Sequence, residues 1–468
     1  MVSQNFEAYS ARALADGLQS NRWTSVELTR HFLARIKVQN PEIHAVPFLF
    51  EEEALAEAKA SDVRRSTGKP LSILDGIPMT IKDAIRMKDS PSTYGIWILR
   101  NHRPRTDSKL VEVLRSSGIV FLGRTAVPTG AFDWNCRNSL YAECVNPFDP
   151  TRTPGGSSGG AAAALATGMT PLELGSDLGG SIRYPAHCCG VFGLRTTDGW
   201  LPIADSGPEN FPSSFTQLAT FGPMARHLGD LDLLLERYSE NFPGQKTPAN
   251  SSKDHLKIAY SKSLLGVSAN ADTRKLFEEM LERLSKQGHE LVETSPYPDF
   301  EELYRVWGII AGHEYTHALP AAIRNRFLLE VFAWWILDHR LGKGPITTNF
   351  KRGIFAGDTL YREACEKRKK ILQTVDRFFE NFQLWILPVA PSPAIPLSLS
   401  GRMIPTENGP MEYSRYLGSY TVPTTTLGTP VLTYPIGKDA TGLPIGIQMH
   451  GPRFADRWLI RIVSELKL

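Results

Sequence analysis

The sequence has little net charge and no long apolar run, and these two absences exclude broad classes of protein. Its formal net charge is +3 over 468 residues, so it has no basic face or tail of the kind that binds nucleic acid. No run reaches about 18 apolar residues, the length that a membrane-spanning helix needs. The N-terminus also lacks the basic and apolar pattern of a secretory leader. We therefore expect a soluble, cytoplasmic protein.

Cysteine is also scarce. The five cysteines are an odd number and show no C-x-x-C spacing, which predicts neither a disulfide framework nor a zinc knuckle and fits a reducing cytosol. We considered the adjacent pair Cys188 and Cys189 as a thiol nucleophile, but neighbouring side chains diverge. We therefore predict that both pack in the core.

Apolar periodicity predicts an α/β protein. Helical spacing runs over residues 10–38, with a break near 21–23 and a capping box at 24–27, and again over 51–65, 107–118, 270–287, 300–339 and 455–466. Short β-prone runs lie at 79–81, 119–123, 257–260 and 383–389. The segment 222–238 reads as a helix, and 241–252 as an exposed connection. This alternation predicts a single large α/β/α domain with a mixed, mainly parallel sheet covered by helices.

Two glycine-flanked serine clusters in residues 154–196 are the candidates for chemistry. They read GGSS at 155–158 and GSDLGGS at 175–181, and glycine lets backbone amides approach a ligand closely. A phosphate cradle at a helix N-terminus is an alternative, but the lysine of the nucleotide-binding pattern is missing. Neither serine lies in G-x-S-x-G, so a base must come from elsewhere in the chain. Upstream, the strand at 79–81 ends on Lys82, which taken alone reads as a solvated residue at a sheet edge.

The same stretches resemble the amidase signature family. Its pattern is matched by GGSSGG at 155–160, GSDLGGSIRYPA at 175–186, CGVFGLRTT at 189–197 and GIPMTIKD at 76–83. Supporting segments extend the resemblance over about residues 10–468. Two departures affect substrate contacts: GRTAVPTG stands at 123–130, and Gln383 occupies a place often held by aspartate.

The resemblance implies a serine–serine–lysine triad. Ser181 would be the nucleophile, Ser157 the bridging serine, joined to Gly156 by a cis peptide bond, and Lys82 the base. Ser158 would support the same network. From their positions beside the nucleophile loop, we expect Asp177 and Arg183 to brace it as an ion pair rather than to contact substrate. Asp83 follows Lys82 on an extended segment, so its side chain should point to the opposite face and have a structural role. No metal or organic cofactor is implied.

The chemistry of such a triad is consistent with the residues themselves. Burial lowers the pKa of a lysine, so a neutral Lys82 is able to take a proton from Ser157, which takes one from Ser181. The backbone N–H groups of residues 178–181 would form the oxyanion hole, namely Leu178, Gly179, Gly180 and Ser181. The helix that begins near Ser158 adds a favourable dipole.

A competing motif lies at residues 313–317, which read H-E-x-x-H. On a helix this places His313 and His317 on one face as zinc ligands, and Glu330 or Asp338 would offer a third. Pro320 limits the helix, and neither carboxylate has a recognisable context. We therefore interpret the motif as a chance match in a helical, aromatic segment, and we favour a role for His313 or His317 in lining a pocket over a zinc peptidase.

The sequence predicts an amidase that hydrolyses a carboxylic amide through an acyl-enzyme. The alternative within the family is an amide synthase or amidotransferase subunit; the glutamyl-tRNA amidotransferase branch typically has glutamine where Tyr184 stands. A catalytically silent scaffold is disfavoured by the intact triad. We divide the domain into N-terminal helices (1–70), a catalytic core (71–235), a helical pocket-forming segment (236–350) and a C-terminal part (351–468). The aromatic segment 300–340 predicts an apolar or aromatic acyl group, and a homodimer is left open.

Overall fold

The computed structural model describes residues 5–204, 206–207, 216–248, 255–319, 324–466 and 468. Its strands build an 11-stranded sheet in the order β1-β3-β2-β4-β6-β5-β12-β13-β11-β7-β10. The strands, in chain order, are β1 (Phe48–Leu49), β2 (Pro78–Lys82), β3 (Val120–Thr125), β4 (Leu172–Asp177), β5 (Phe192–Arg195), β6 (Thr220–Ala225), β7 (Lys257–Tyr260), β10 (Glu290–Glu293), β11 (Leu384–Pro388), β12 (Val431–Lys438) and β13 (Pro444–His450). A separate hairpin pairs β8 (Ser263–Leu264) with β9 (Val267–Ser268).

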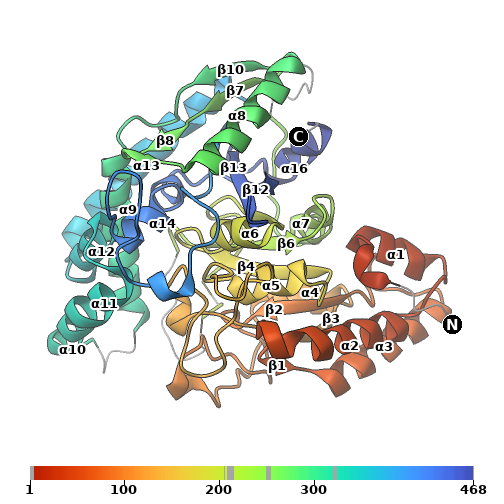
Figure 1. Cartoon of the computed structure of the whole chain (residues 1–468). Helices are drawn as coiled ribbons and strands as arrows, with labels where there is room; N and C mark the ends of the chain where they lie inside the picture. The colour runs from red at the N-terminus through yellow and green to blue at the C-terminus, as the bar shows by residue number, and fades with distance from the viewer. Residues whose placement is uncertain (1–4, 205, 208–215, 249–254, 320–323, 467) are drawn as a thin grey trace.

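The helices pack around this sheet. They are α1 (Ala11–Gln19), α2 (Ser25–Ile43), α3 (Glu51–Ser66), α4 (Lys109–Ser116), α5 (Gly159–Ala166), α6 (Arg183–Cys189), α7 (Asp230–Asn241), α8 (Ala271–Lys286), α9 (Phe300–Ala318), α10 (Arg326–Val331), α11 (Asp338–Leu341), α12 (Pro345–Ile354), α13 (Asp358–Asn381), α14 (Tyr413–Gly418), α15 (Val422–Thr425) and α16 (Asp456–Glu465). A π-helical turn, Phe332–Leu337, joins α10 to α11. Figure 1 shows α1, α2 and α3 around the β1 end of the sheet and α8 at the β10 end.

The structure confirms the predicted mixed sheet covered by helices, but the prediction that the strands are mainly parallel is wrong. Four of the neighbouring strand pairs are parallel: β2 with β3 and β4, and β7 with β10 and β11. The other six pairs are antiparallel. The crossover through α4 gives a parallel pair, whereas a short turn between β12 and β13 forces antiparallel pairing.

Most predicted elements are present within a few residues of their expected ends. The capping box that starts α2 is formed, since Thr24 accepts from the Glu27 backbone N–H and Glu27 accepts from the Thr24 N–H. The segment 222–238 was predicted as one helix, and this is wrong at its start. Residues 220–225 form the buried strand β6, and α7 begins only at Asp230. Part of the predicted connection at 241–252 lies outside the described residues, as does Pro320.

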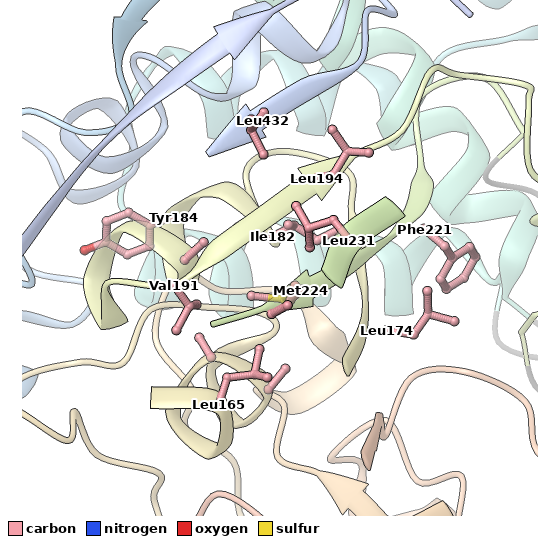
Figure 2. Packing of buried hydrophobic residues seen from close by; sticks show 14 of the residues in the cluster. Leu165, Leu174, Ile182, Tyr184, Val191, Leu194, Phe221, Met224, Leu231 and Leu432 are labelled. Carbon is pink, nitrogen blue, oxygen red and sulfur yellow. The ribbon is translucent and has the colours of Figure 1, made fainter. Parts of the chain in front are cut away.

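The core of the sheet anchors the segment that follows the serine clusters. Figure 2 shows Ile182, the residue after Ser181, among Leu194 and Met224. A side chain at Gly175 in β4 would come within 3.0 Å of Ile182 and 3.1 Å of the Met224 sulfur. A larger residue there would have to push these side chains aside. Because Ile182 is fully buried, the backbone on either side of it is held against β4 and β5.

Candidate active site

Three segments meet at the carboxyl ends of two neighbouring parallel strands. Lys82 ends β2, Asp177 ends β4, and the two strands pair directly. Carboxyl ends of parallel strands lie at the same edge of a sheet, so Lys82 faces the loop that follows β4. The third segment precedes α5 and carries Ser157 and Ser158. The Ser158 N–H donates to the Ser181 carbonyl oxygen at 3.1 Å, which joins the two serine loops.

Lys82 is fully buried and is not the solvated edge residue that its sequence context alone indicates. The reason is that β2 is an interior strand, flanked by β3 and β4. Burial lowers the pKa of Lys82 from its ordinary value to about 7, against the opposing effect of nearby acidic groups, Asp177 first among them. A large fraction of the side chain is therefore neutral near pH 7.

Three hydroxyl groups surround the Lys82 amine. Its Nζ lies 2.8 Å from Ser157 Oγ, 2.8 Å from Ser158 Oγ and 2.9 Å from Ser176 Oγ. A neutral amine has two N–H donors and one lone pair, so at least one of these hydroxyls must donate its proton to the nitrogen. Sequence reasoning missed Ser176. The only feature that could have indicated its place near Lys82 is its position on β4, the strand beside β2.

The Gly156–Ser157 peptide bond is cis, as the resemblance implied. Ser158 is the N-cap residue of α5, but its hydroxyl makes no capping hydrogen bond. That hydroxyl instead lies against Lys82 and also donates to the Ser176 carbonyl oxygen at 3.4 Å. This agrees with a supporting place for Ser158 in the same network. Among the hydrogen bonds of the described residues, none joins the hydroxyls of Ser157 and Ser181.

Side chains from other segments hold two carbonyl groups of the loop from Leu178 to Ser181. The Trp307 indole donates to the Leu178 carbonyl oxygen at 2.8 Å. The Gly179 carbonyl oxygen accepts from the Trp134 indole at 3.3 Å and from the Thr421 hydroxyl at 2.9 Å. Within the described part of the chain, the N–H groups of Leu178, Gly179 and Ser181 donate to no other group.

Gly180 departs from the expected oxyanion hole. Its N–H donates to Asp177 Oδ1 at 2.8 Å, so this donor is already used and we remove it from the predicted set. The backbone at Gly180 has φ +114°, and a Cβ there would lie 2.5 Å from the Thr421 hydroxyl oxygen. Glycine therefore shapes this turn without itself offering a free donor.

The predicted Asp177–Arg183 ion pair is formed and is fully buried. The Arg183 guanidinium lies 2.9 Å from Asp177, whose other oxygen accepts from the Ile182 N–H at 3.0 Å. Burial alone would raise the pKa of Asp177, but Arg183, Arg195 and the Gly180 N–H together outweigh it and hold that pKa well below its usual range. Arg183 also donates to Thr424 and Thr425 of α15 at 2.8 and 2.7 Å. The pair thus fixes both ends of the nucleophile loop.

Other residues singled out in the sequence lie away from this site. Asp83 is buried and accepts from the Thr93 N–H at 2.8 Å, which fits the structural place predicted for it. Burial raises the pKa of Asp83 to about 6. Cys188 and Cys189 are buried in the core, as predicted, and the five cysteines are free thiols. Gln383 accepts from the Lys257 N–H at 2.8 Å at the start of β11, so it makes a structural contact.

A cavity opens onto Ser181, and its walls are largely apolar. Its apolar side chains are Ala131, Phe132, Trp134, Leu178, Trp307, Leu337, Leu341, Ile346 and Phe350. Segment 300–340 therefore contributes Trp307 and Leu337, while Trp334 and Trp335, which are 61% and 73% exposed, face away. Asp133 is the one charged side chain among the described lining residues. Burial raises its pKa to about 6.

The sequence left open whether His313 or His317 lines this pocket, and neither is among the cavity's described lining residues. His313 stacks on Tyr361 with ring centroids 4.2 Å apart. Asp338, considered as a third zinc ligand, instead pairs with Lys351 at 2.6 Å.

No helix among the described residues has both the length and the apolar character needed to cross a membrane.

Comparison with known proteins agrees with this geometry. A family model described as Amidase matches residues 27–460. The chain is 34% identical to the A subunit of the glutamyl-tRNA(Gln) amidotransferase of Chloroflexus aggregans, over 95% of this chain and 93% of the relative. It is 31% identical to the protein of the same name from a Picosynechococcus strain, over 96% of both chains.

Solved structures give the same fold. A structure described as a vestigial protein complex that reveals the origins of an s-triazine catabolic enzyme has a TM-score of 0.81 and 26% identity, covering 98% of this chain and 99% of that one. A crystal structure of an amidase has a TM-score of 0.78 and 25% identity, covering 97% and 98%. A bacterial aryl acylamidase, at 22% identity and a TM-score of 0.80 over 97% and 94%, supports the fold alone.

Proposed function

The chain belongs to the amidase signature family of enzymes that act on carbon–nitrogen bonds, and on that premise we propose that it hydrolyses a carboxylic amide with an apolar acyl group. The observation that carries the proposal is the cavity at Ser181, whose walls are aromatic and aliphatic. An apolar acyl group gains about 25 cal/mol for each Å² of apolar surface that it removes from water. The acyl carbon would then lie next to the Ser181 hydroxyl.

Proton transfer in the proposed mechanism starts at Lys82. The neutral amine accepts the Ser157 proton, and Ser157 accepts the proton of Ser181 as the Ser181 oxygen attacks the amide carbonyl. Ser158 and Ser176 accept the two amine N–H groups and so orient the lone pair toward Ser157. The shift of the Lys82 pKa to about 7 makes this base effective near neutral pH.

Negative charge that develops on the carbonyl oxygen would be bound by the N–H groups of Leu178, Gly179 and Ser181. Removing one such donor commonly costs about 100- to 1000-fold in kcat. Ser157 then gives its proton to the leaving amine and is reprotonated by the Lys82 ammonium, which restores the neutral base. In the second half, Ser157 and Lys82 take a proton from water as it attacks the acyl-enzyme, and Ser157 returns a proton to the Ser181 oxygen as the acid leaves.

A second candidate is transfer of the amide nitrogen, in which the chain releases ammonia from glutamine for a partner enzyme. The names of the relatives at 34% and 31% identity favour it over hydrolysis. Glutamine carries an ammonium and a carboxylate. Among the described lining residues, Asp133 would pair with the ammonium group, but there is no cation to pair with the carboxylate. Tyr184 stands where the amidotransferase branch typically has glutamine. It is fully buried in α6 and is not among the cavity's described lining residues.

Rates measured on a panel of amides distinguish the two candidates. Aliphatic amides of increasing length, aryl amides and glutamine are each incubated with the purified chain, and the released ammonia or amine is measured. We expect kcat/KM to rise with the apolar area of the acyl group. Faster release of ammonia from glutamine than from any apolar amide would replace hydrolysis with the second candidate. Ser181→Ala serves as the blank for both.

A further inference from the structure

Two histidines and an aspartate lie together outside the proposed active site. His313 and His317 are one turn apart on α9, and their rings stack with centroids 4.1 Å apart. Asp358 is the first residue of α13, and its Oδ1 lies 3.9 Å from His313 Nε2. One ligand atom from each of the three side chains lies within 4.8 Å of the other two.

Hydrogen bonds to the backbone orient both rings in the same way. His313 Nδ1 lies 3.1 Å from the Ala356 carbonyl oxygen, and His317 Nδ1 lies 2.9 Å from the His313 carbonyl oxygen. A carbonyl oxygen only accepts, so each ring donates from Nδ1, which leaves Nε2 as the nitrogen available to bind a metal. Metal-binding histidines are usually held in this way, with the second nitrogen donating to a carbonyl or carboxylate group.

We propose that His313, His317 and Asp358 form a Zn²⁺ site that ties α9 to α13. Two imidazole nitrogens and one carboxylate suit zinc, whereas Ca²⁺ and Mg²⁺ prefer oxygen ligands. Zinc–ligand bonds of about 2.0–2.1 Å place the ligand atoms of a tetrahedral site about 3.3 Å apart. The His313 and His317 rings stack with an angle of 27° between their planes, so their Nε2 lone pairs do not point at one position in this structure. The exposed His317 ring and the 79% exposed Asp358 side chain must turn to close the site around the metal. Water takes the fourth position.

This site differs from the zinc peptidase that H-E-x-x-H indicates. The intervening Glu314 is buried, and its Oε1 accepts from the Tyr361 hydroxyl at 3.1 Å and the Thr216 hydroxyl at 3.2 Å. It is therefore held by protein groups rather than by a metal-bound water. The metal has a structural effect instead. Helix α9 also carries Trp307, which walls the cavity and holds the Leu178 carbonyl group, so zinc would fix this helix near its C-terminal end.

Zinc binding by the full chain tests the proposal without any measurement of activity. Protein without a histidine tag is treated with a chelator, dialysed against Zn²⁺, and analysed for bound metal and for its thermal unfolding midpoint. We expect one Zn²⁺ per chain and a higher midpoint with zinc. His317→Ala and Asp358→Asn each change an exposed side chain, so the variants should fold. Each should weaken zinc binding by about 100-fold, at the upper end of the loss seen when a ligand's supporting contacts are removed.

Cys365→Ser is the matched control, because this free thiol lies on α13 and is of a type that binds zinc, but is not part of the proposed site. The variant should bind zinc as the unaltered chain does. Absence of stoichiometric zinc binding by the unaltered chain would overturn the proposal. Unchanged affinity in the double variant His317→Ala/Asp358→Asn would overturn it equally, since the bound metal would then lie elsewhere.

Discussion

The indole N–H of Trp307 donates to the carbonyl oxygen of Leu178 at 2.8 Å, so the wall of the cavity and the nucleophile loop are held by one contact. Trp307 lies in the middle of α9, and Leu178 follows β4. A peptide carbonyl held on one side of the loop turns the next N–H group to the other. The aromatic side chain that bounds the acyl group thus also orients a proposed oxyanion donor.

Replacing Trp307 with phenylalanine separates these two effects. Trp307→Phe keeps an aromatic wall but removes the donor to Leu178. The loss of one hydrogen bond, worth about 1 kcal/mol, should lower kcat about fivefold. Steady-state kinetics on the best apolar amide measures this. Trp334→Phe is the control, because that ring is exposed and should leave kcat unchanged. A normal kcat with a raised KM in Trp307→Phe would mean that Trp307 serves only as a wall.

The pKa of Lys82 sets a prediction for pH dependence. Below about pH 7 the side chain is protonated and does not accept a proton, and above it the neutral amine predominates. With an uncharged substrate, kcat/KM should therefore rise about tenfold per unit at acidic pH and level off above pH 7.

Asp133 is the control for that profile, since it lines the cavity and burial raises its pKa to about 6. In Asp133→Asn the midpoint should stay near pH 7, whatever happens to the absolute rate. A midpoint that moves or disappears in this variant would assign the titration to Asp133 and not to Lys82.

The buried ion pair gives a prediction for stability. Asp177→Asn leaves the Arg183 guanidinium buried without its anion, and breaking such a pair costs about 3–5 kcal/mol of the free energy of unfolding. Denaturant unfolding of both proteins measures the difference. Glu282→Gln is the matched control, because Glu282 pairs with Lys286 on an exposed helix surface and should change stability little. Equal effects of the two substitutions would contradict the bracing of the loop by Asp177.

Local sequence patterns predicted the parts of the site that lie within motifs. The strand ending on Lys82, the two serine loops and the Asp177–Arg183 pair each depend on residues a few positions apart. Their meeting at one sheet edge was implied by the family resemblance. The cis bond at Gly156–Ser157 also came from that resemblance and not from physical reasoning.

The parts of the site and the fold that the sequence did not predict depend on contacts between segments that are distant in the chain. Trp134 and Trp307 reach the loop from separate elements, and no local pattern pairs either with residues 178–179. Strand β6 was misread because its GPMA sequence lacks the alternation of a half-buried strand, being buried throughout. Gly180 was assigned a free N–H because the sequence does not reveal that Asp177 folds back onto it.

The proposed nucleophile is most directly tested by labelling with an alkyl or aryl fluorophosphonate, followed by intact-protein mass spectrometry and peptide mapping. An activated Ser181 should take up one phosphonyl group. Ser181→Ala should take up none, and Lys82→Ala should react orders of magnitude more slowly, because triad members act as a unit. Circular dichroism confirms that each variant is folded. An adduct on another residue, or labelling of Ser181 at the normal rate in Lys82→Ala, would contradict a nucleophile activated by the buried lysine.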